Sequence, residues 1–576
     1  MTLDRVSPSR DRTAVDAVAD GYLEALAAEN PLFATFTGIL GHDDRLTDLS
    51  PAGHARLADL ARSTLAALDS AVPVDQTDAV TAAAMRERLG LVVERHRLGL
   101  DLADLNNIAS PVQLLRDVFD LTPTATVEDW TRVAARLAAV RTAVVGYQES
   151  LEAALGGGWT PPARQVRAGA GQAREFGAPE GFYVTFAREA RTADGDALPE
   201  DLQAQLDAGG ADAAAAYMEL ADWMEATLLP RATERDAVGR DVYAVHTREY
   251  LGTVVDVDET YAWGLEELAR VERRMAEVAR RLAPDAPSGD DPASVQAAIA
   301  AGIAALDADP ARSIDTAEAF RDWMQEVSDR AVEELGATHF DIPEPVRTLR
   351  CRIAPSSSGA VYYTPPSEDF SRPGQMWWSV PAGTDTFSTW RETSTVYHEG
   401  VPGHHLQCGQ VAYLSDSLNR WRRLGCWVSG HGEGWALYAE RLMEELGYLE
   451  DDGDLMGMLD AHALRASRVV VDIGVHCGLP APEEVGGGTW DADKAWTFLR
   501  THTRVPDAQL RFELERYLGW PGQAIAYKVG ERAWLDLREQ VRAREGDAFD
   551  LRDFHRRALD LGSVGLDVLR SALLSA

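Results

Sequence analysis

One segment of the sequence concentrates residue types that bind metals and move protons. It reads Tyr-His-Glu-Gly-Val-Pro-Gly-His-His from residue 397 to 405, and it places Glu399 beside His398, with His404 and His405 shortly after them. Imidazole nitrogens and carboxylate oxygens are common ligands of zinc. Three histidines and an acid within eight residues therefore favour a metal centre over histidines that merely cap a broken helix.

The spacing differs from that of the usual zinc-binding helix. In an H-E-x-x-H motif, a step of four residues brings both imidazoles to one ion, while the intervening glutamate faces the bound water. Here Pro402 occupies the fourth position after His398. On an unbroken helix, His404 would lie about 240° around the axis and His405 about 10.5 Å along it. Because Pro402 and Gly403 can interrupt the helix, we expect His404 to reach the second-ligand position, with His405 as the alternative.

A third protein ligand and an open position for water would complete a catalytic zinc site. The segment Gly-His-Gly-Glu-Gly-Trp at residues 430–435 supplies Glu433, whose neighbouring glycines let the backbone approach closely. Glu440 lies two turns further along nearly the same helix face. It could hydrogen bond to a ligand histidine, and the alternative is a surface acid on an acidic protein.

The elements that carry these residues are predicted to be mainly helical. Apolar residues recur at helical spacing through most of the chain before Asp341 and again after about Ser388. The texture between these points is typical of a small antiparallel sheet, a three-stranded meander. Its predicted strands are Arg347–Ile353, Ala360–Tyr363 and Gln375–Val380.

Length and charge limit the class of protein. The 576 residues carry 56 basic and 92 acidic side chains, a formal net charge of −36, which disfavours nucleic acid and anionic membranes as partners. The start of the chain lacks the regions of a signal peptide, and no apolar run reaches about 18 residues, so we expect a cytoplasmic protein. We divide the chain into a helical scaffold lobe, 1–330, and a catalytic lobe, 331–576, which together form one structural unit.

Three motifs make the chain resemble DUF885, a bacterial family named only as a domain of unknown function. They are H-E-G-V-P-G-H-H, E-G-W-A-L-Y-A-E and the P-G-Q-A-I-A-Y-K-V-G of residues 521–530. More distantly, the step from Glu433 to Glu440, the Thr-Arg-Val-Pro-Asp at 503–507 and the Tyr-x-x-Gly at Tyr527 are similar to the carboxypeptidase Taq family of gluzincin metallopeptidases. The resemblance implies a zincin-like, two-lobed helical clamshell with the small sheet beside a deep active-site cleft.

The resemblance also assigns roles to single residues. It implies that His398, His404 and Glu433 bind Zn, with His405 as the reserve second ligand. Glu399 would be the general base, which takes a proton from water and returns it to the leaving amine. Tyr527 would hydrogen bond to the oxyanion, unless it is simply a core tyrosine.

Substrate-binding residues are indicated less sharply. Arg504 lies in the segment similar to the carboxypeptidase arginine motif and could bind the C-terminal carboxylate of a peptide, or pair with Asp507. Arg372, between two predicted strands, could bind substrate or stabilise its loop. His405 joins these two if it is not a ligand.

These inferences favour an enzyme, a zinc metallopeptidase that hydrolyses short peptides. Two alternatives stay open. One is metal-dependent hydrolysis of a different amide or ester, and the other is an inactive helical binding protein on a peptidase scaffold. The sequence leaves open the native metal, the end from which a peptide would be cleaved and the oligomeric state.

Overall fold

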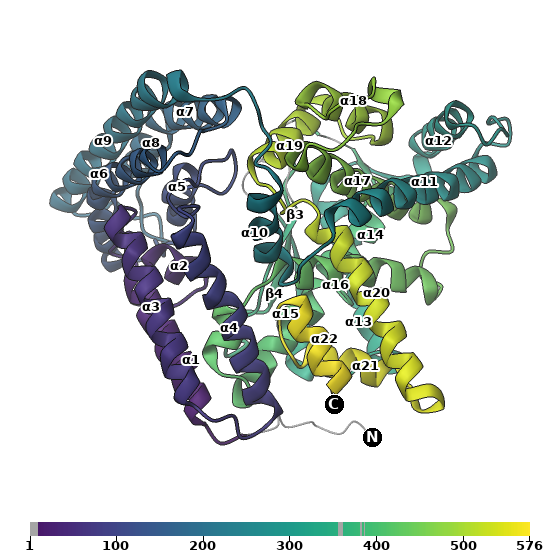
Figure 1. Cartoon of the computed structure of the whole chain (residues 1–576), viewed down its shortest axis with the longest axis horizontal. Coiled ribbons are helices and arrows are strands. Elements are labelled where there is room, and N and C mark those ends of the chain that lie inside the picture. The colour runs from purple at the N-terminus through teal and green to yellow at the C-terminus, as the bar shows by residue number, and fades with distance from the viewer. Residues whose placement is uncertain (1–9, 355–360, 381–382, 385, 576) are drawn as a thin grey trace.

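Helices form most of this computed structural model, which describes residues 10–354, 361–380, 383–384 and 386–575. The helices of the first 223 residues gather on one side of the molecule (Figure 1). They are α1 (Ala14–Glu29), α2 (Pro31–Phe36), α3 (Pro51–Ser70), α4 (Gln76–Arg97), α5 (Pro111–Leu121), α6 (Val127–Gly156), α7 (Ala163–Gly177), α8 (Phe182–Arg188) and α9 (Glu200–Trp223).

The later helices form the larger body, on the other side of Figure 1. They are α10 (Arg240–Leu251), α11 (Val257–Leu282), α12 (Pro292–Asp307), α13 (Ala317–Thr338), α14 (Thr389–Glu399), α15 (His404–Tyr413), α16 (Ser429–Glu445), α17 (Asp452–Cys477), α18 (Ala492–His502), α19 (Asp507–Gly519), α20 (Ala526–Glu545), α21 (Leu551–Leu559) and α22 (Leu566–Ser575). The predicted mainly helical class is confirmed. None of the described helices combines the length and the apolar character needed to cross a membrane.

A small sheet stands where the sequence predicted one, but its topology differs from the prediction. Its strands are β2 (Leu349–Ile353), β3 (Val361–Thr364) and β4 (Gly374–Trp378), in the order β2-β4-β3. β4 pairs parallel with β2 and antiparallel with β3, so the antiparallel meander is wrong. Ala360, predicted to begin the second strand, lies outside the described residues.

Burial explains the order of the strands. Four of the five β4 residues are buried, whereas β3 has no buried residue. The central strand of a sheet is covered by neighbours on both edges, so the most apolar strand is the one that gains most from that place. A second, two-stranded sheet was not predicted; it pairs β1 (Ser313–Ile314) with β5 (Phe387–Ser388), directly before α14.

The buried apolar side chains of the described residues form two hydrophobic cores. The smaller one is built mainly from α5 to α9, with Tyr183 and Tyr217 among its fully buried side chains. The larger one joins α1 and α4 to the elements from α10 onward, and it includes α11, which packs along α17. The boundary that we expected at residue 330 therefore falls inside the larger core.

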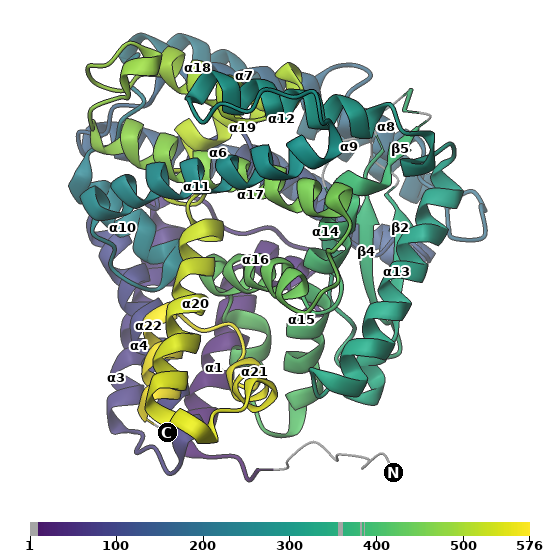
Figure 2. The ribbon, with the colours of Figure 1, turned by 90° about the vertical axis from the view of Figure 1, so that its right-hand side faces the viewer.

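Helix α16 crosses the middle of the larger body, where α20 and α14 pack against it (Figure 2). The backbones of α16 and α20 come into contact at two glycines, Gly434 and Gly530. A Cβ atom added to Gly434 would lie 2.5 Å from the carbonyl carbon of Gly530, which is closer than real Cβ atoms come to backbone. The absence of side chains at these two positions thus lets the helices touch, and it fixes how the residues next to them face each other.

Candidate metal centre

The helix break expected at Pro402 and Gly403 is complete. Helix α14 ends at Glu399, and α15 begins at His404. The turn between them is so tight that a Cβ atom on Gly403 would lie 1.9 Å from the carbonyl oxygen of His398. Only glycine fits this position, and the turn sets the two histidines at the facing ends of separate helices.

Helix α16 holds this turn in place. The indole Nε1 of Trp435 donates a hydrogen bond to the carbonyl oxygen of Pro402 at 2.9 Å. Trp435 is fully buried, so its ring cannot swing away without opening the core. The same first turns of α16 carry Glu433, and the anchor therefore ties the histidine-bearing turn to the helix that bears the carboxylate.

Three predicted ligands converge. The Nε2 atoms of His398 and His404 each lie 3.5 Å from the same oxygen, Oε2 of Glu433. One ligand atom from each of the three residues lies within 4.8 Å of the other two. Ligands bonded at 2.0–2.1 Å to a tetrahedral ion would stand about 3.3 Å apart. The separations and the two-nitrogen, one-oxygen donor set thus fit a divalent metal such as zinc.

A buried carboxylate orients the first of these histidines. The Nδ1–H group of His398 donates to Oε1 of Glu440 at 2.8 Å, and the hydroxyl group of Ser394 donates to the other oxygen of Glu440. Because a carboxylate only accepts, Nδ1 carries the hydrogen and Nε2 faces Glu433. The proposed contact of Glu440 with a ligand histidine is therefore present, and this acid is 1% exposed rather than on the surface.

The site has the electrostatics of a cation-binding centre. Burial alone would lower the pKa of His398, but hydrogen bonds to Glu433 and Glu440 outweigh it and raise that pKa to about 10. Burial likewise acts to raise the pKa of Glu433, and the two histidines hold it below its usual range. A field that retains a proton so strongly also favours a metal cation.

His405 does not face this group. Its Nε2–H group donates to the carbonyl oxygen of Val346 at 2.6 Å, and its Nδ1 accepts from the hydroxyl group of Tyr363 at 2.9 Å. Burial lowers its pKa to about 4, so the ring is neutral. His404 differs, because its Nδ1 atom is buried and has no hydrogen-bond partner in the described parts of the chain. Between the two histidines that the sequence left open, His404 is the one at the centre.

The charges of the ligand residues act on both the predicted base and the predicted oxyanion donor. Glu399 is buried, and burial raises its pKa. The nearby charges of His404 and His398 act to lower that pKa, and the charge of Glu433 acts to raise it. Tyr527, half-buried at the start of α20, has its pKa raised by burial and then by the negative charge of Glu433. The Gly434–Gly530 contact explains why the charge of Glu433 acts on Tyr527. Glu433 is one residue from Gly434 along α16, and Tyr527 is three residues from Gly530 along α20.

The two predicted substrate arginines are not part of the centre. Arg504 donates to the carbonyl oxygen of His502 at 2.9 Å and to the side chain of Gln296. Its expected partner Asp507 instead pairs with Arg500 at 3.1 Å. Arg372 lies between β3 and β4, where its charge acts on Tyr363. The geometry therefore gives neither residue a contact with the three ligands.

Two residues that sequence reasoning missed interact with residues of the centre. The ring of Trp427 lies 6.3 Å from that of His404, and 49% of this tryptophan is exposed. Arg465, on α17, acts with its charge on Glu399 and Tyr527. Neither had a usable signal, because arginine is frequent in this chain and Trp427 precedes the recognisable motif.

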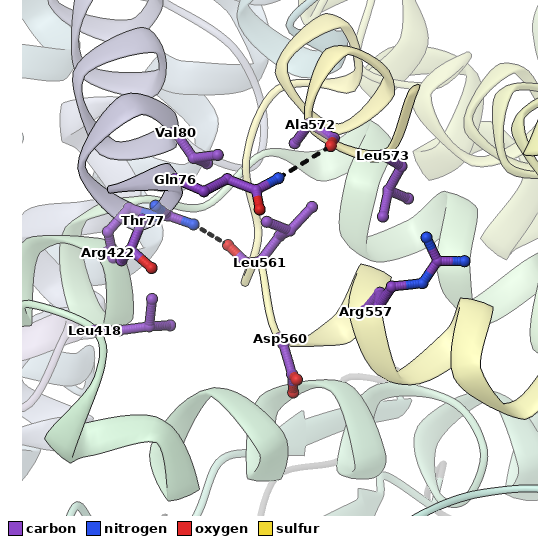
Figure 3. Close-up of a pocket in the computed structure, with 10 residues that line it drawn as sticks. All are labelled: Gln76, Thr77, Val80, Leu418, Arg422, Arg557, Asp560, Leu561, Ala572 and Leu573. Atoms are coloured by element: carbon purple, nitrogen blue, oxygen red, sulfur yellow. Dashed lines mark hydrogen bonds between the residues drawn. The ribbon is translucent and has the colours of Figure 1, made fainter. Parts of the chain in front are cut away.

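A pocket elsewhere in the molecule has no part in this centre. It has a volume of about 210 Å³ and lies between α4 and the C-terminal helices (Figure 3). Gln76 donates to the carbonyl oxygen of Ala572 at 3.2 Å on one side of it, and Arg422 donates to that of Leu561 on the other. None of the three predicted ligands lines it.

Comparisons with known proteins agree on family and fold. The family described as "Bacterial protein of unknown function (DUF885)" matches residues 31–573. The crystal structure of a "putative lipoprotein" from Colwellia psychrerythraea is similar, with a TM-score of 0.79 and 23% identity over 97% of this chain and 98% of that one. A "putative lipoprotein of unknown function" from Shewanella oneidensis has a TM-score of 0.74 and 14% identity, over 97% and 99%. Such identities indicate the fold alone, and no curated protein matches.

Proposed function

This chain belongs to the DUF885 family, and we propose that it is a zinc-dependent metallopeptidase that hydrolyses short peptides. The observation that carries the proposal is the approach of two imidazole Nε2 atoms to one carboxylate oxygen, 3.5 Å from each. His398, His404 and Glu433 would hold the ion. We infer further that the substrate enters between two lobes of a clamshell, as in the carboxypeptidase Taq family, and that the protein works in the cytoplasm.

When bound, zinc supplies a Lewis acid that polarises the scissile carbonyl and lowers the pKa of a water molecule towards neutrality. The protein residues do the rest. Glu399 accepts the proton of that water and passes it to the leaving nitrogen, and burial suits it to this role because its raised pKa makes the carboxyl group a better base. The hydroxyl group of Tyr527 donates to the oxyanion that forms at the carbonyl.

The test is hydrolysis of a mixture of short peptides by the zinc-loaded protein, by the same protein after chelation, and by zinc-loaded Glu399→Gln. Of these three samples, we expect only the untreated zinc-loaded protein to hydrolyse the peptides. Glu444→Gln is the matched control, since this acid lies on α16 but bonds to Arg274, away from the ligands. Equal turnover in all four samples would overturn the proposal.

The same experiments also test the two alternative functions. Nothing in the ligand set itself selects a peptide, so a change in a metabolite fraction other than peptides would favour another amide or ester. A protein that binds no zinc, even after reconstitution, would favour the inactive binding protein. Near-stoichiometric zinc without any turnover would support the metal centre and contradict the peptidase.

A further inference from the structure

Trp427 is an exposed tryptophan beside one of the three ligands, and the proposed mechanism does not use it. Of the 15 tryptophans in the chain, all of them within the described residues, it alone is exposed, and the others are buried or half-buried. The centroid of its ring lies 6.3 Å from that of His404. A single exposed apolar side chain is ordinary on a protein surface. What sets Trp427 apart is its position and the structure that supports it.

The backbone on either side of Trp427 is fixed. Cys426 and Val428 are both buried. The thiol group of Cys426 donates to the carbonyl oxygen of Ser563 at 3.3 Å, and the amide group of Val428 donates to the hydroxyl oxygen of the same serine at 3.1 Å. Ser563 is itself buried, in the segment between α21 and α22. The indole ring is therefore exposed on an anchored backbone and not on a loose segment.

Gly432 supports the ring from below. A Cβ atom added to this glycine would lie 2.5 Å from Cζ2 and 2.6 Å from Cη2 of Trp427, so the six-membered part of the indole rests on the backbone of α16. Gly432 directly precedes Glu433. The ring thus contacts the helix turn that carries one ligand and lies next to another ligand, His404. An extended peptide advances about 3.3 Å per residue, so a side chain one or two residues from a scissile bond at the ligands lies within reach of the ring.

The chemistry of this ring favours an apolar partner. The hydrophobic free energy gained on binding is proportional to the apolar area removed from water, and 49% of this large side chain is exposed. An indole face also attracts cations, but at an exposed ring that attraction is smaller than the gain from covering a large apolar side chain. An aromatic or branched aliphatic side chain therefore gains most from this ring.

We propose that Trp427 binds a large apolar side chain of the substrate peptide next to the scissile bond, and so determines which peptides the enzyme prefers and which bond it cuts. The inference rests on the proposed function. It names a class of substrate that the ligand set does not, because two imidazoles and a carboxylate act alike on any amide.

The first experiment measures binding without turnover. Zinc-loaded Glu399→Gln protein is titrated by calorimetry with the pentapeptides Ala-Ala-X-Ala-Ala, in which X is Phe, Leu, Ala, Lys or Asp. We expect the Phe and Leu peptides to bind about tenfold or more tightly than the Ala peptide, because one large apolar side chain is covered. Equal affinities, tightest binding of the Lys or Asp peptide, or no binding by any of them would overturn the inference.

The second experiment tests Trp427 itself in the same background. Trp427→Ala should reduce the preference for Phe over Ala to less than about threefold, whereas Trp427→Phe should keep most of it, because a phenyl ring still offers an apolar face. Trp496→Leu is the matched control. This tryptophan lies on α18, where Arg511 covers its ring, and its loss should leave the preference unchanged. A full preference in Trp427→Ala would count against the residue.

Gly432→Ala moves the ring without removing it. The added methyl group takes the place of Cζ2 and Cη2, and an exposed side chain can swing aside where backbone could not. We expect this variant to lose the preference as Trp427→Ala does, and all of these variants to keep near-stoichiometric zinc. A full preference in Gly432→Ala would contradict the proposal. So would loss of zinc in both Trp427→Ala and Trp427→Phe, because it would assign the ring to holding the ligands.

Cleavage positions give a readout that binding does not. Octapeptides of Ala and Gly with one Phe at the third, fourth or fifth position are hydrolysed by the zinc-loaded parent protein, and mass spectrometry identifies the products. The bond that is cut should move with the Phe residue, since Trp427 sets the register, and this coupling should be lost in Trp427→Ala. A cut at a fixed distance from either end of the peptide, whatever the position of the Phe, would overturn the inference.

The two proposals fail in different ways. Without any zinc-dependent hydrolysis but with a preference for Phe that depends on Trp427, the apolar binding site stands and the peptidase falls. With hydrolysis of the Phe and Ala pentapeptides at equal kcat/KM in both the parent protein and Trp427→Ala, the peptidase stands and the role of Trp427 falls.

Discussion

The Nδ1 atom of His398 and the Oε1 atom of Glu440 lie 2.8 Å apart, and both side chains are almost fully buried. Burial acts to raise the pKa of Glu440, but hydrogen bonds with His398 and His462 hold it well below its usual range. This acid therefore stays ionised inside the protein. It fixes the tautomer and the ring orientation of His398, which leaves Nε2 as the only nitrogen that can reach a metal.

Glu440→Gln should weaken zinc binding about 10- to 100-fold, because the amide still accepts a hydrogen bond but no longer strengthens the imidazole as a ligand. Competition with a fluorescent chelator measures the affinity. Glu444→Gln, one turn further along α16, should bind zinc as tightly as the parent protein. An unchanged affinity in Glu440→Gln would show that the carboxylate does not support the ligand.

His404 and His405 should behave in opposite ways when they are changed. His404→Ala removes one of the three ligands, and the zinc content of the purified protein should fall to a trace with little change in stability. His405→Ala leaves the carbonyl group of Val346 and the hydroxyl group of Tyr363 without their partner, which should cost about 1–3 kcal/mol of the free energy of unfolding. That variant should still bind one zinc ion. Metal analysis and urea denaturation separate the two results, and loss of zinc in His405→Ala alone would reverse the assignment.

Tyr527→Phe should lower kcat about 100-fold and leave KM nearly unchanged, because the phenol acts on the oxyanion and not on the bound substrate. The ring remains, so the packing of Arg468 on it is preserved. Steady-state kinetics on a peptide that the parent protein cleaves gives both constants. A rise in KM at constant kcat would instead assign the hydroxyl group to substrate binding.

The sequence was most informative where one short segment determines the geometry. Pro402 and Gly403 predicted a break in the helix, and the break is present. Gly403 makes it possible, because only glycine fits against the carbonyl oxygen of His398 in so tight a turn. The ligand types could likewise be read from the motifs, since the chemistry of imidazole and carboxylate is independent of the fold. The choice between His404 and His405 as the second ligand could not be read from the motifs, because it depends on how far the turn rotates α15.

Features that depend on contacts between distant segments could not be predicted from the sequence. The place of β4 at the centre of its sheet follows from the burial of this strand against the rest of the fold, which local alternation does not encode. Arg465 is one arginine among many, and what distinguishes it is that its charge acts on Glu399 and Tyr527. Such a property arises only after α14, α17 and α20 have packed.

His502 gives the fold a dependence on pH that is separate from the metal centre. Its Nδ1 lies 2.7 Å from Glu272 and its Nε2 3.1 Å from Glu484. Burial would lower its pKa, but the two carboxylates raise it to about 9, above the ordinary value of 6.5. The folded state thus binds the proton more tightly, so this contribution is complete below about pH 6.5 and is lost as the pH rises through 9.

His502→Gln should therefore be less stable than the parent protein at pH 6, by on the order of 2 kcal/mol after allowance for the exposure of Glu484. The difference should shrink by pH 9.5, because the parent loses its proton there. Urea denaturation at both pH values measures it. A difference that stays constant between the two would mean that the ring is held by packing and not by its charge.

Gly434→Ala should separate the two helices that carry Glu433 and Tyr527. The added Cβ atom would lie 2.5 Å from the backbone of Gly530, and backbone cannot move aside as a flexible side chain can. We expect a loss of about 1–3 kcal/mol in the free energy of unfolding from this overpacking. Zinc affinity should fall as well, since α16 must shift. Gly171→Ala on α7 is the matched control: no atom lies within 4 Å of its added Cβ, and it should stabilise the protein by about 0.5–1 kcal/mol. If both variants melted alike and bound zinc alike, the glycine contact would not be what places the site.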